Sequence, residues 1–273
     1  MTCTKADDVV RLFAQAGRAR RDLERWMRHP RRGHVPEYVM QHVTAAVYRI
    51  TPQDVKGLIS EHAIGDIRPE QGYAVSAIKD WRPDFAFAHI LHCCAEKLGG
   101  VFPYEELRRF AAQDPDGIRM LGQPARSHVE KVVASGRCTW EQARAAMQWR
   151  IGLFYYSFIR EIYVLSCLRE MGLDMRTHPL ADALFRVDGW CGSAVLSLYI
   201  KNEEFRDGSA GRKPQAREIL TDGQDLGLSF VELAMEVQRK HGVVHLPSGE
   251  QIDDCARRIK HELEHSPHDP QQL

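Results

Sequence analysis

The feature that most constrains the fold is a long run of apolar residues spaced by threes and fours, which ends at a glycine and gives way to short extended segments. The run starts near Thr139, and its members are Met147, Ile151, Phe154, Phe158, Ile162, Leu165 and Leu168. This spacing predicts a helix with one apolar face, and Gly172 ends it. A chain whose periodicity changes here from helical to strand-like is expected to build a mixed α/β unit.

Two strand-like segments follow the long helix, over residues 182–188 and 194–201, and the glycines at 189 and 192 predict a turn between them. We expect these segments to form a hairpin. Helical sequence returns at 216–220 and 228–240, residues 243–246 resemble a further strand, and a last helix spans about 250–264. Residues 265–273 have little to bury and are expected to form a disordered tail.

Residues 1–138 show an almost wholly helical pattern divided by prolines and glycines, with no strong strand signal. The sequence therefore predicts a helical region over 1–138 and an α/β domain over 139–264. One helical segment, 89–94 (HILHCC), brings two histidines and two cysteines together. No second cluster of matching spacing follows, so we expect helix residues whose cysteines act as small buried hydrophobes, in preference to a zinc site.

Composition narrows the class of protein. Lysine plus arginine and aspartate plus glutamate are equal at 37 each, so no overall positive field recruits nucleic acid. No stretch approaches the roughly 20 apolar residues of a membrane span, and the first residues lack a secretory signal, so we expect a cytoplasmic protein without a membrane partner. Seven scattered cysteines fit a reducing compartment.

The most basic segment is 18–32, which holds seven arginines against Asp22 and Glu24. Arginine forks suit phosphate oxygens and Trp26 could stack on a base, so Arg25 and Arg28 are candidate nucleic-acid contacts. One alternative is a solvated helix face whose arginines pair with acids elsewhere. Another is that these helices contact an acidic partner protein or a second copy of the chain.

Three residues of the C-terminal half form a pattern with a known chemistry. Glu161 lies in REIYVLSCLREMGL, Asp188 ends FRVD, and Lys201 lies in LYIKN. In this order and spacing they resemble the helix acid, strand aspartate and strand lysine of the PD-(D/E)xK nuclease superfamily. The resemblance implies a small mixed-sheet, restriction-endonuclease-like αβββαβ core behind a mostly helical N-terminal region, an α+β or α/β fold class.

The resemblance also implies a metal-dependent active site. Asp188, Glu161 and the carbonyl of Ile200 would hold Mg²⁺ or Mn²⁺ through hard oxygen ligands, and Lys201 would orient or activate the attacking water. The sequence departs from the family at Tyr199, where the family has Asp or Glu.

Strand alternation nominates two acids that could replace the missing one. Glu203 has the parity of Lys201, and Asp182 has that of Asp188. Six residues of extended strand would place Asp182 some 20 Å from Asp188, so Glu203 is the nearer candidate. We therefore predict Glu161, Asp188, Lys201 and Glu203 as catalytic residues.

The loop after the second strand carries Arg206, Arg212 and Lys213, which could bind phosphate beside this site, or form an exposed basic turn. The sequence thus predicts a nucleic-acid-processing protein, a metal-dependent DNA nuclease acting on DNA in preference to RNA. Two alternatives stay open, a catalytically inactive nuclease-like module that binds nucleic acid and a helical interaction or regulatory protein.

Overall fold

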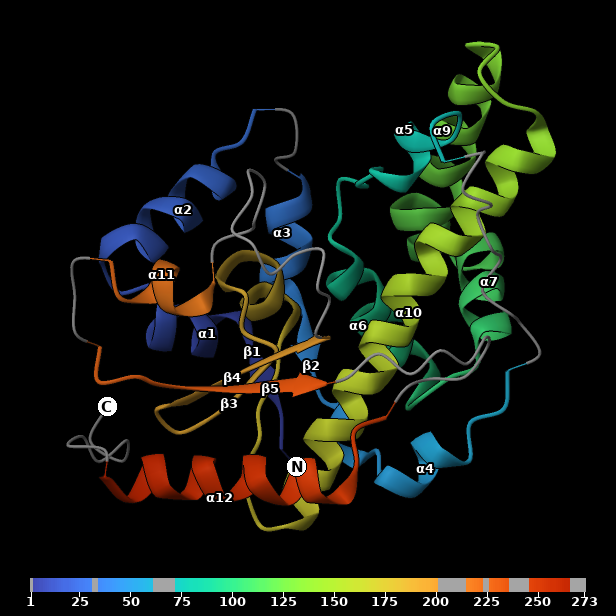
Figure 1. The fold of residues 1–273 in the computed structure, drawn as a ribbon. Coiled ribbons are helices and arrows are strands. Elements are labelled where there is room, and N and C mark those ends of the chain that lie inside the picture. Colours follow the sequence, from blue (N-terminus) through green and yellow to red (C-terminus); the bar gives the residue numbers. More distant parts are fainter. Residues whose placement is uncertain are drawn as a thin grey trace.

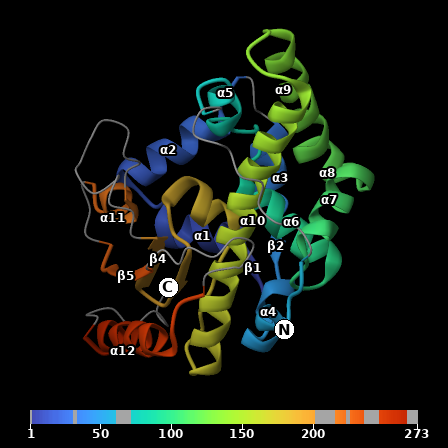
Figure 2. The same cartoon turned by 45° about the vertical axis from the view of Figure 1, so that its right-hand side comes forward.

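The computed structural model describes residues 2–30, 34–60, 72–200, 215–222, 226–235 and 246–265. Over these ranges the chain is mostly helical, with a two-stranded and a three-stranded sheet. The long helix α10 (Trp140–Glu170) runs diagonally between two groups of elements (Figure 1). One group is the three-stranded sheet with helices above and below it, and the other is a set of helices from the middle of the chain (Figures 1 and 2).

The N-terminal elements are mostly helical, as predicted, but they include a small sheet. The helices are α1 (Ala6–Phe13), α2 (Gly17–Met27) and α3 (His34–Gln41). Strands β1 (Thr4–Lys5) and β2 (Val43–Thr44) pair antiparallel, although this region has no strong strand signal in its sequence. Two residues are too few for an alternating pattern to appear in the sequence.

The middle of the chain is helical, as predicted. Its elements are η1 (Ala46–Arg49), α4 (Pro52–Lys56), α5 (Ser76–Lys79), α6 (Phe87–Leu98), α7 (Tyr104–Gln113), α8 (Pro115–Gly117), the π-helical η3 (Ile118–Gly122) and α9 (Gln123–Ala134). Helices α4, α5, α6 and α9 all contact α10, which is therefore the common support of this group.

Helix α10 forms where the apolar spacing predicts it. Thr139 and Gln142 make a reciprocal capping box at its start, and Gly172, with φ of 84°, adopts the left-handed conformation that ends it. Among the described residues it is the one helix long and apolar enough to cross a membrane, but 72% of its most apolar window is buried inside the protein. That degree of burial is typical of a core helix.

The three-stranded sheet has the order β3 (Gly189–Cys191), β4 (Ala194–Ile200), β5 (Ser229–Met235), with β3 antiparallel and β5 parallel to β4. The predicted strand over 182–188 was wrong. The π-helical turn η4 (Ala181–Phe185) takes its place, and Arg186, at φ of 62°, ends that turn. Ala181 and Phe185 are both buried four residues apart, so the core selects a helical turn over an alternating strand.

A second correction concerns residues 228–240, for which the sequence predicts a helix. The structure has β5 there, because the residues pair with β4 and alternate between buried Val231, Leu233 and Met235 and the more exposed residues between them. Leucine, glutamate, alanine and methionine favour helices, and pairing with a neighbouring strand overrides that preference. Helices α11 (Ala216–Leu220) and α12 (Gly249–His265) are confirmed, whereas 236–245, with most of the predicted last strand, lie outside the described residues.

The N-terminal helices pack on the C-terminal sheet. The Phe13 ring lies edge-on to Trp190 of β3 at 5.3 Å and contacts Phe185 at 6.2 Å, so α1 buries apolar surface against residues more than half the chain away in sequence. On the opposite side of the sheet, α12 buries Ile252 and Ile259 in a second apolar cluster. The sheet is thus covered on both faces, with α1, α2 and α11 on one side and α12 on the other (Figure 1).

The close approach of α10 to β3 gives a test of this packing. A Cβ added at Gly189 would lie 2.5 Å from Leu165 Cδ2 and 3.1 Å from the Arg176 carbonyl oxygen. We expect Gly189→Ala to lower the free energy of unfolding by about 1–3 kcal/mol, measured by denaturant titration. Gly100→Ala is the matched control, since no atom lies within 4 Å of its added Cβ. Equal stability of the two variants would contradict this packing.

Candidate metal centre

Three carboxylates from three successive parts of the fold meet beside the sheet. Glu161 comes from α10, Asp182 from the turn η4, and Asp188 from the residue before β3. One oxygen of each lies within 4.8 Å of one oxygen of each of the others. Glu161 is buried and the two aspartates are half-buried, so the oxygens line a common, largely water-excluded position.

Asp188 is held against the edge of β4. Its N–H donates to the Leu196 carbonyl at 3.1 Å, and its carboxylate accepts a hydrogen bond from the Leu198 N–H. Asp188 therefore continues the antiparallel pairing with β4 one residue before the start of β3. This bond fixes the carboxylate in place and uses one of its lone pairs.

The turn η4 brings Asp182 to the cluster. The N–H of Arg186 donates to the Asp182 carbonyl at 3.2 Å, and the N–H of Val187 donates to the Ala181 carbonyl at 3.1 Å, which folds the chain back before β3. The sequence-based estimate of some 20 Å between Asp182 and Asp188 assumed an extended strand and was wrong. The signal that could have found the turn is the spacing of Ala181 and Phe185, four residues apart.

A hydrogen-bond donor from the segment after α10 lies beside Glu161. The Thr177 hydroxyl donates to Glu161 Oε1 at 3.4 Å. Thr177 is itself fixed, because its N–H donates to the Tyr48 hydroxyl at 3.1 Å and its carbonyl accepts from that hydroxyl at 2.9 Å. Tyr48, from η1, thereby links the N-terminal half to the segment that supports the buried carboxylate.

The carbonyl of Ile200 points toward the same edge of β4 as Asp188. Along a strand, alternate residues direct their N–H and C=O groups to the same side. Leu196 and Leu198 bond to Asp188 on that side, and Ile200 follows two residues later in the same strand. Tyr199 instead lines a separate surface hollow of about 490 Å³ with residues of β5 and α12, so its side chain does not occupy the carboxylate cluster.

Burial and mutual repulsion govern the charge of the cluster. Burial, and then the negative charges of Asp188 and Asp182, raise the pKa of Glu161 well above its usual value. Burial and then Asp182 likewise raise the pKa of Asp188, opposed by the Leu198 N–H and by Arg186. Three ionised carboxylates in this position repel one another, so a retained proton or a cation between them would stabilise the cluster at neutral pH.

The other predicted site residues fall into two groups. Lys201, Glu203, Arg206, Arg212 and Lys213 lie outside the described residues. Arg25 and Arg28 are exposed on or just after α2, where Arg25 pairs with Asp22 at 2.8 Å. Further arginines of α2 pair with acids, as Arg21 does with Asp222 at 2.9 Å, which matches the alternative of a solvated, acid-paired helix face.

Trp26, the predicted base-stacking residue in α2, is half-buried and packs against the main apolar cluster. Its ring therefore supports the helix in this conformation.

No known protein family, curated protein or solved structure matches this chain. The chemistry of the site must therefore be inferred from its geometry.

The raised pKa values predict how stability changes with pH. The folded protein binds more protons than the unfolded chain at pH values between the unfolded and folded pKa of each carboxyl, so the free energy of unfolding falls as pH rises through that window. Glu161→Gln removes the most buried of these charges. In chelator-treated protein we expect it to increase the free energy of unfolding near neutral pH, on the order of 1 kcal/mol or more, with no gain near about pH 4.

Denaturant titrations across this pH range measure the difference. Glu264→Gln, at an exposed position of α12, is the control and should leave the profile unchanged. A Glu161→Gln variant that is less stable than wild type near neutral pH would show that the carboxylate is paired with a cationic group.

Proposed function

We propose that this protein is a divalent-cation-dependent phosphodiester hydrolase of a divergent PD-(D/E)xK type, acting on nucleic acid, with DNA as its substrate in preference to RNA. The observation that carries the proposal is the meeting of Glu161, Asp182 and Asp188 within 4.8 Å at the edge of the sheet. Hard oxygen ligands of this kind suit Mg²⁺ or Mn²⁺.

The arrangement of the strands supports the same proposal. The acid-bearing helix α10 precedes an antiparallel pair, β3 and β4, and after α11 the strand β5 adds parallel to β4. This is the order of helix, hairpin, helix and strand in which the resemblance places its acids and lysine. Asp188 and the Ile200 carbonyl both face the β3 edge of β4, where the resemblance implies metal ligands.

Asp182 can replace the acidic ligand that is missing at Tyr199. A third carboxylate is present, but it comes from the turn before β3 in place of the strand position that tyrosine occupies. Under this proposal Asp182, Asp188, Glu161 and the Ile200 carbonyl are the ligands, and Glu203 is not needed. A bound Mg²⁺ or Mn²⁺ would stabilise the negative charge that develops on the phosphate oxygens.

The remaining chemistry falls to the protein. Lys201 comes directly after Ile200, and under this proposal its ammonium orients the attacking water. The water loses a proton to solvent as its oxygen bonds to phosphorus, the P–O ester bond breaks, and the leaving oxygen takes up a proton from solvent. Arg206, Arg212 and Lys213 would bind neighbouring phosphates.

Cleavage assays on single- and double-stranded DNA and on RNA test the proposal, each with Mg²⁺, Mn²⁺ or a chelator. We expect metal-dependent cleavage by the wild type and at least a roughly 100-fold loss in Asp188→Ala and in Asp182→Ala, because each removes a ligand. Lys201→Ala should lose activity while keeping metal affinity, measured by Mn²⁺ titration. Asp253→Ala, at an exposed position of α12, is the control and should retain activity.

The outcomes separate the alternatives. Equal cleavage by wild type and all site variants would overturn the assignment. Salt-sensitive binding of nucleic acid without cleavage or metal binding would identify an inactive nuclease-like module.

A further inference from the structure

Four histidines gather in a second buried cluster, which the proposed hydrolase does not use. His42 follows α3, His89 and His92 lie one turn apart on α6, and His178 precedes η4. The ring of His42 is central, with ring centres 5.4 Å from His89, 5.8 Å from His92 and 5.3 Å from His178. His89, His92 and His178 are at most 3% exposed.

Three ring nitrogens of this cluster are buried and have no hydrogen-bond partner among the described residues. They are Nε2 of His42, Nδ1 of His89 and Nδ1 of His92. A buried polar atom without a partner costs free energy, on the order of 1–3 kcal/mol. Three such nitrogens on adjacent rings point to a common ligand that accepts their lone pairs.

His178 differs from the other three because both of its nitrogens are used. Its Nδ1 accepts from the Leu180 N–H at 3.1 Å, so the ring proton lies on Nε2, which donates to the His42 carbonyl at 3.2 Å. His178 thus supports His42 from behind and leaves three nitrogens as ligands.

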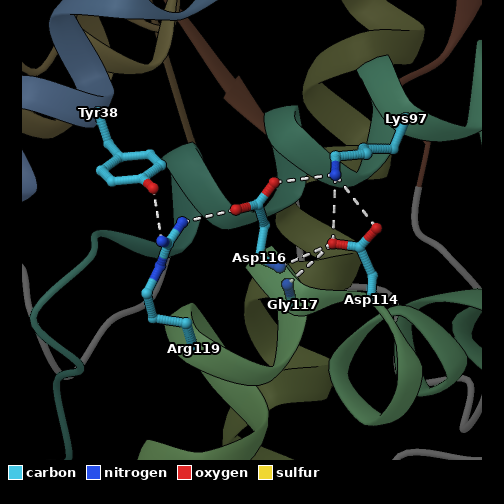
Figure 3. A network of polar contacts seen from close by, with 6 residues as sticks. All are labelled: Tyr38, Lys97, Asp114, Asp116, Gly117 and Arg119. Atoms are coloured by element: carbon cyan, nitrogen blue, oxygen red, sulfur yellow. Dashed lines mark hydrogen bonds and ion pairs between the residues drawn. The ribbon is translucent and has the colours of Figure 1, made fainter.

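Asp114 and Asp116 belong to a network of charged residues that does not include the four histidines (Figure 3). Lys97 bonds to Asp114 at 3.2 Å and to Asp116 at 2.9 Å, and Arg119 pairs with Asp116 and contacts Tyr38. The negative charge of Asp116 acts on His89, but two cations, Lys97 and Arg119, already pair with this carboxylate. The ligand set of the cluster is therefore nitrogen alone, which suits Zn²⁺ and related transition metals and excludes Mg²⁺.

We propose that His42, His89 and His92 form a binding site for a transition-metal ion of the zinc class, joining the end of α3 to α6. Two imidazoles that share a zinc ion at about 2 Å have ring centres roughly 5 Å apart, close to the spacings of His42 from His89 and His92. The rings of Phe85, stacked on His89 at 5.5 Å, and Phe158, edge-on to His92 at 5.3 Å, provide an apolar shell.

Binding requires the imidazoles to turn. The ring nitrogens of the three histidines do not all lie within 4.8 Å of one another, whereas the carboxylate oxygens of the acidic cluster do. The three rings must therefore rotate about their side-chain torsions to share one metal ion. The site thus differs from the acidic cluster in ligand chemistry as well as place, and it stands whether or not the protein is a hydrolase.

Zinc titration of the full-length, chelator-treated protein tests this proposal. We expect the wild type to bind about one equivalent of Zn²⁺ at this site and to melt at a higher temperature with zinc. His92→Gln and His42→Gln should each weaken binding at least about 10-fold, and Co²⁺ should give visible absorption bands in the wild type that both variants lose. Two variants are used because His92 is the more deeply buried, and circular dichroism checks that each is folded.

Controls remove the other zinc-binding groups. His261 and His265 are exposed on α12 with rings stacked at 4.2 Å, so the double variant His261→Ala/His265→Ala removes a surface chelate, and Glu161→Gln weakens the acidic cluster. Both controls should keep the tight site and its cobalt bands. Absence of zinc binding in the wild type, full binding in both His42→Gln and His92→Gln, or its loss in either control would overturn the proposal.

Discussion

The burial of a carboxylate in the middle of α10 is the constraint on which the C-terminal half depends. The helix must be apolar to fill the core, yet it carries Glu161 at a position where an ionised group is costly. The hydrogen bond from Thr177 offsets only part of that cost, and the charges of Asp182 and Asp188 add to it. A fold that brings three acids together in this way trades stability for a local negative charge, as binding sites for cations do.

The elements that the sequence predicts correctly are those in which the apolar pattern repeats over many residues. Helices α10 and α12 each span several turns, so their apolar faces repeat often enough to be recognised. The sequence does not predict the short strands. β1 and β2 have two residues each, and β5 consists of residues that favour helices, so its identity depends on the hydrogen bonds that β4 supplies.

The candidate site shows the same division between local and distant information. Glu161 is predicted in its correct element, because an acid within a long apolar helix depends on local pattern, whereas Asp188 was expected to end a strand and in fact lies between η4 and β3. Asp182 was misplaced because a single turn, η4, replaces an extended segment. The histidine cluster joins residues as far apart as His42 and His178, 136 positions along the chain, and the spacing of 89–94 alone gave no sign of them.

The contact between Phe13 and Trp190 joins two segments that are synthesised at well-separated times. α1 is among the first segments to leave the ribosome, but the ring that covers Phe13 belongs to a strand made more than half a chain later. Helix α1 also contacts β1 and α3, which lie close to it in the sequence, but Phe13 gains its contacts with Phe185 and Trp190 only after η4 and β3 have been synthesised. Contacts of such wide sequence separation form slowly, so the apolar surface around Phe13 stays exposed to other chains until the C-terminal sheet has been made.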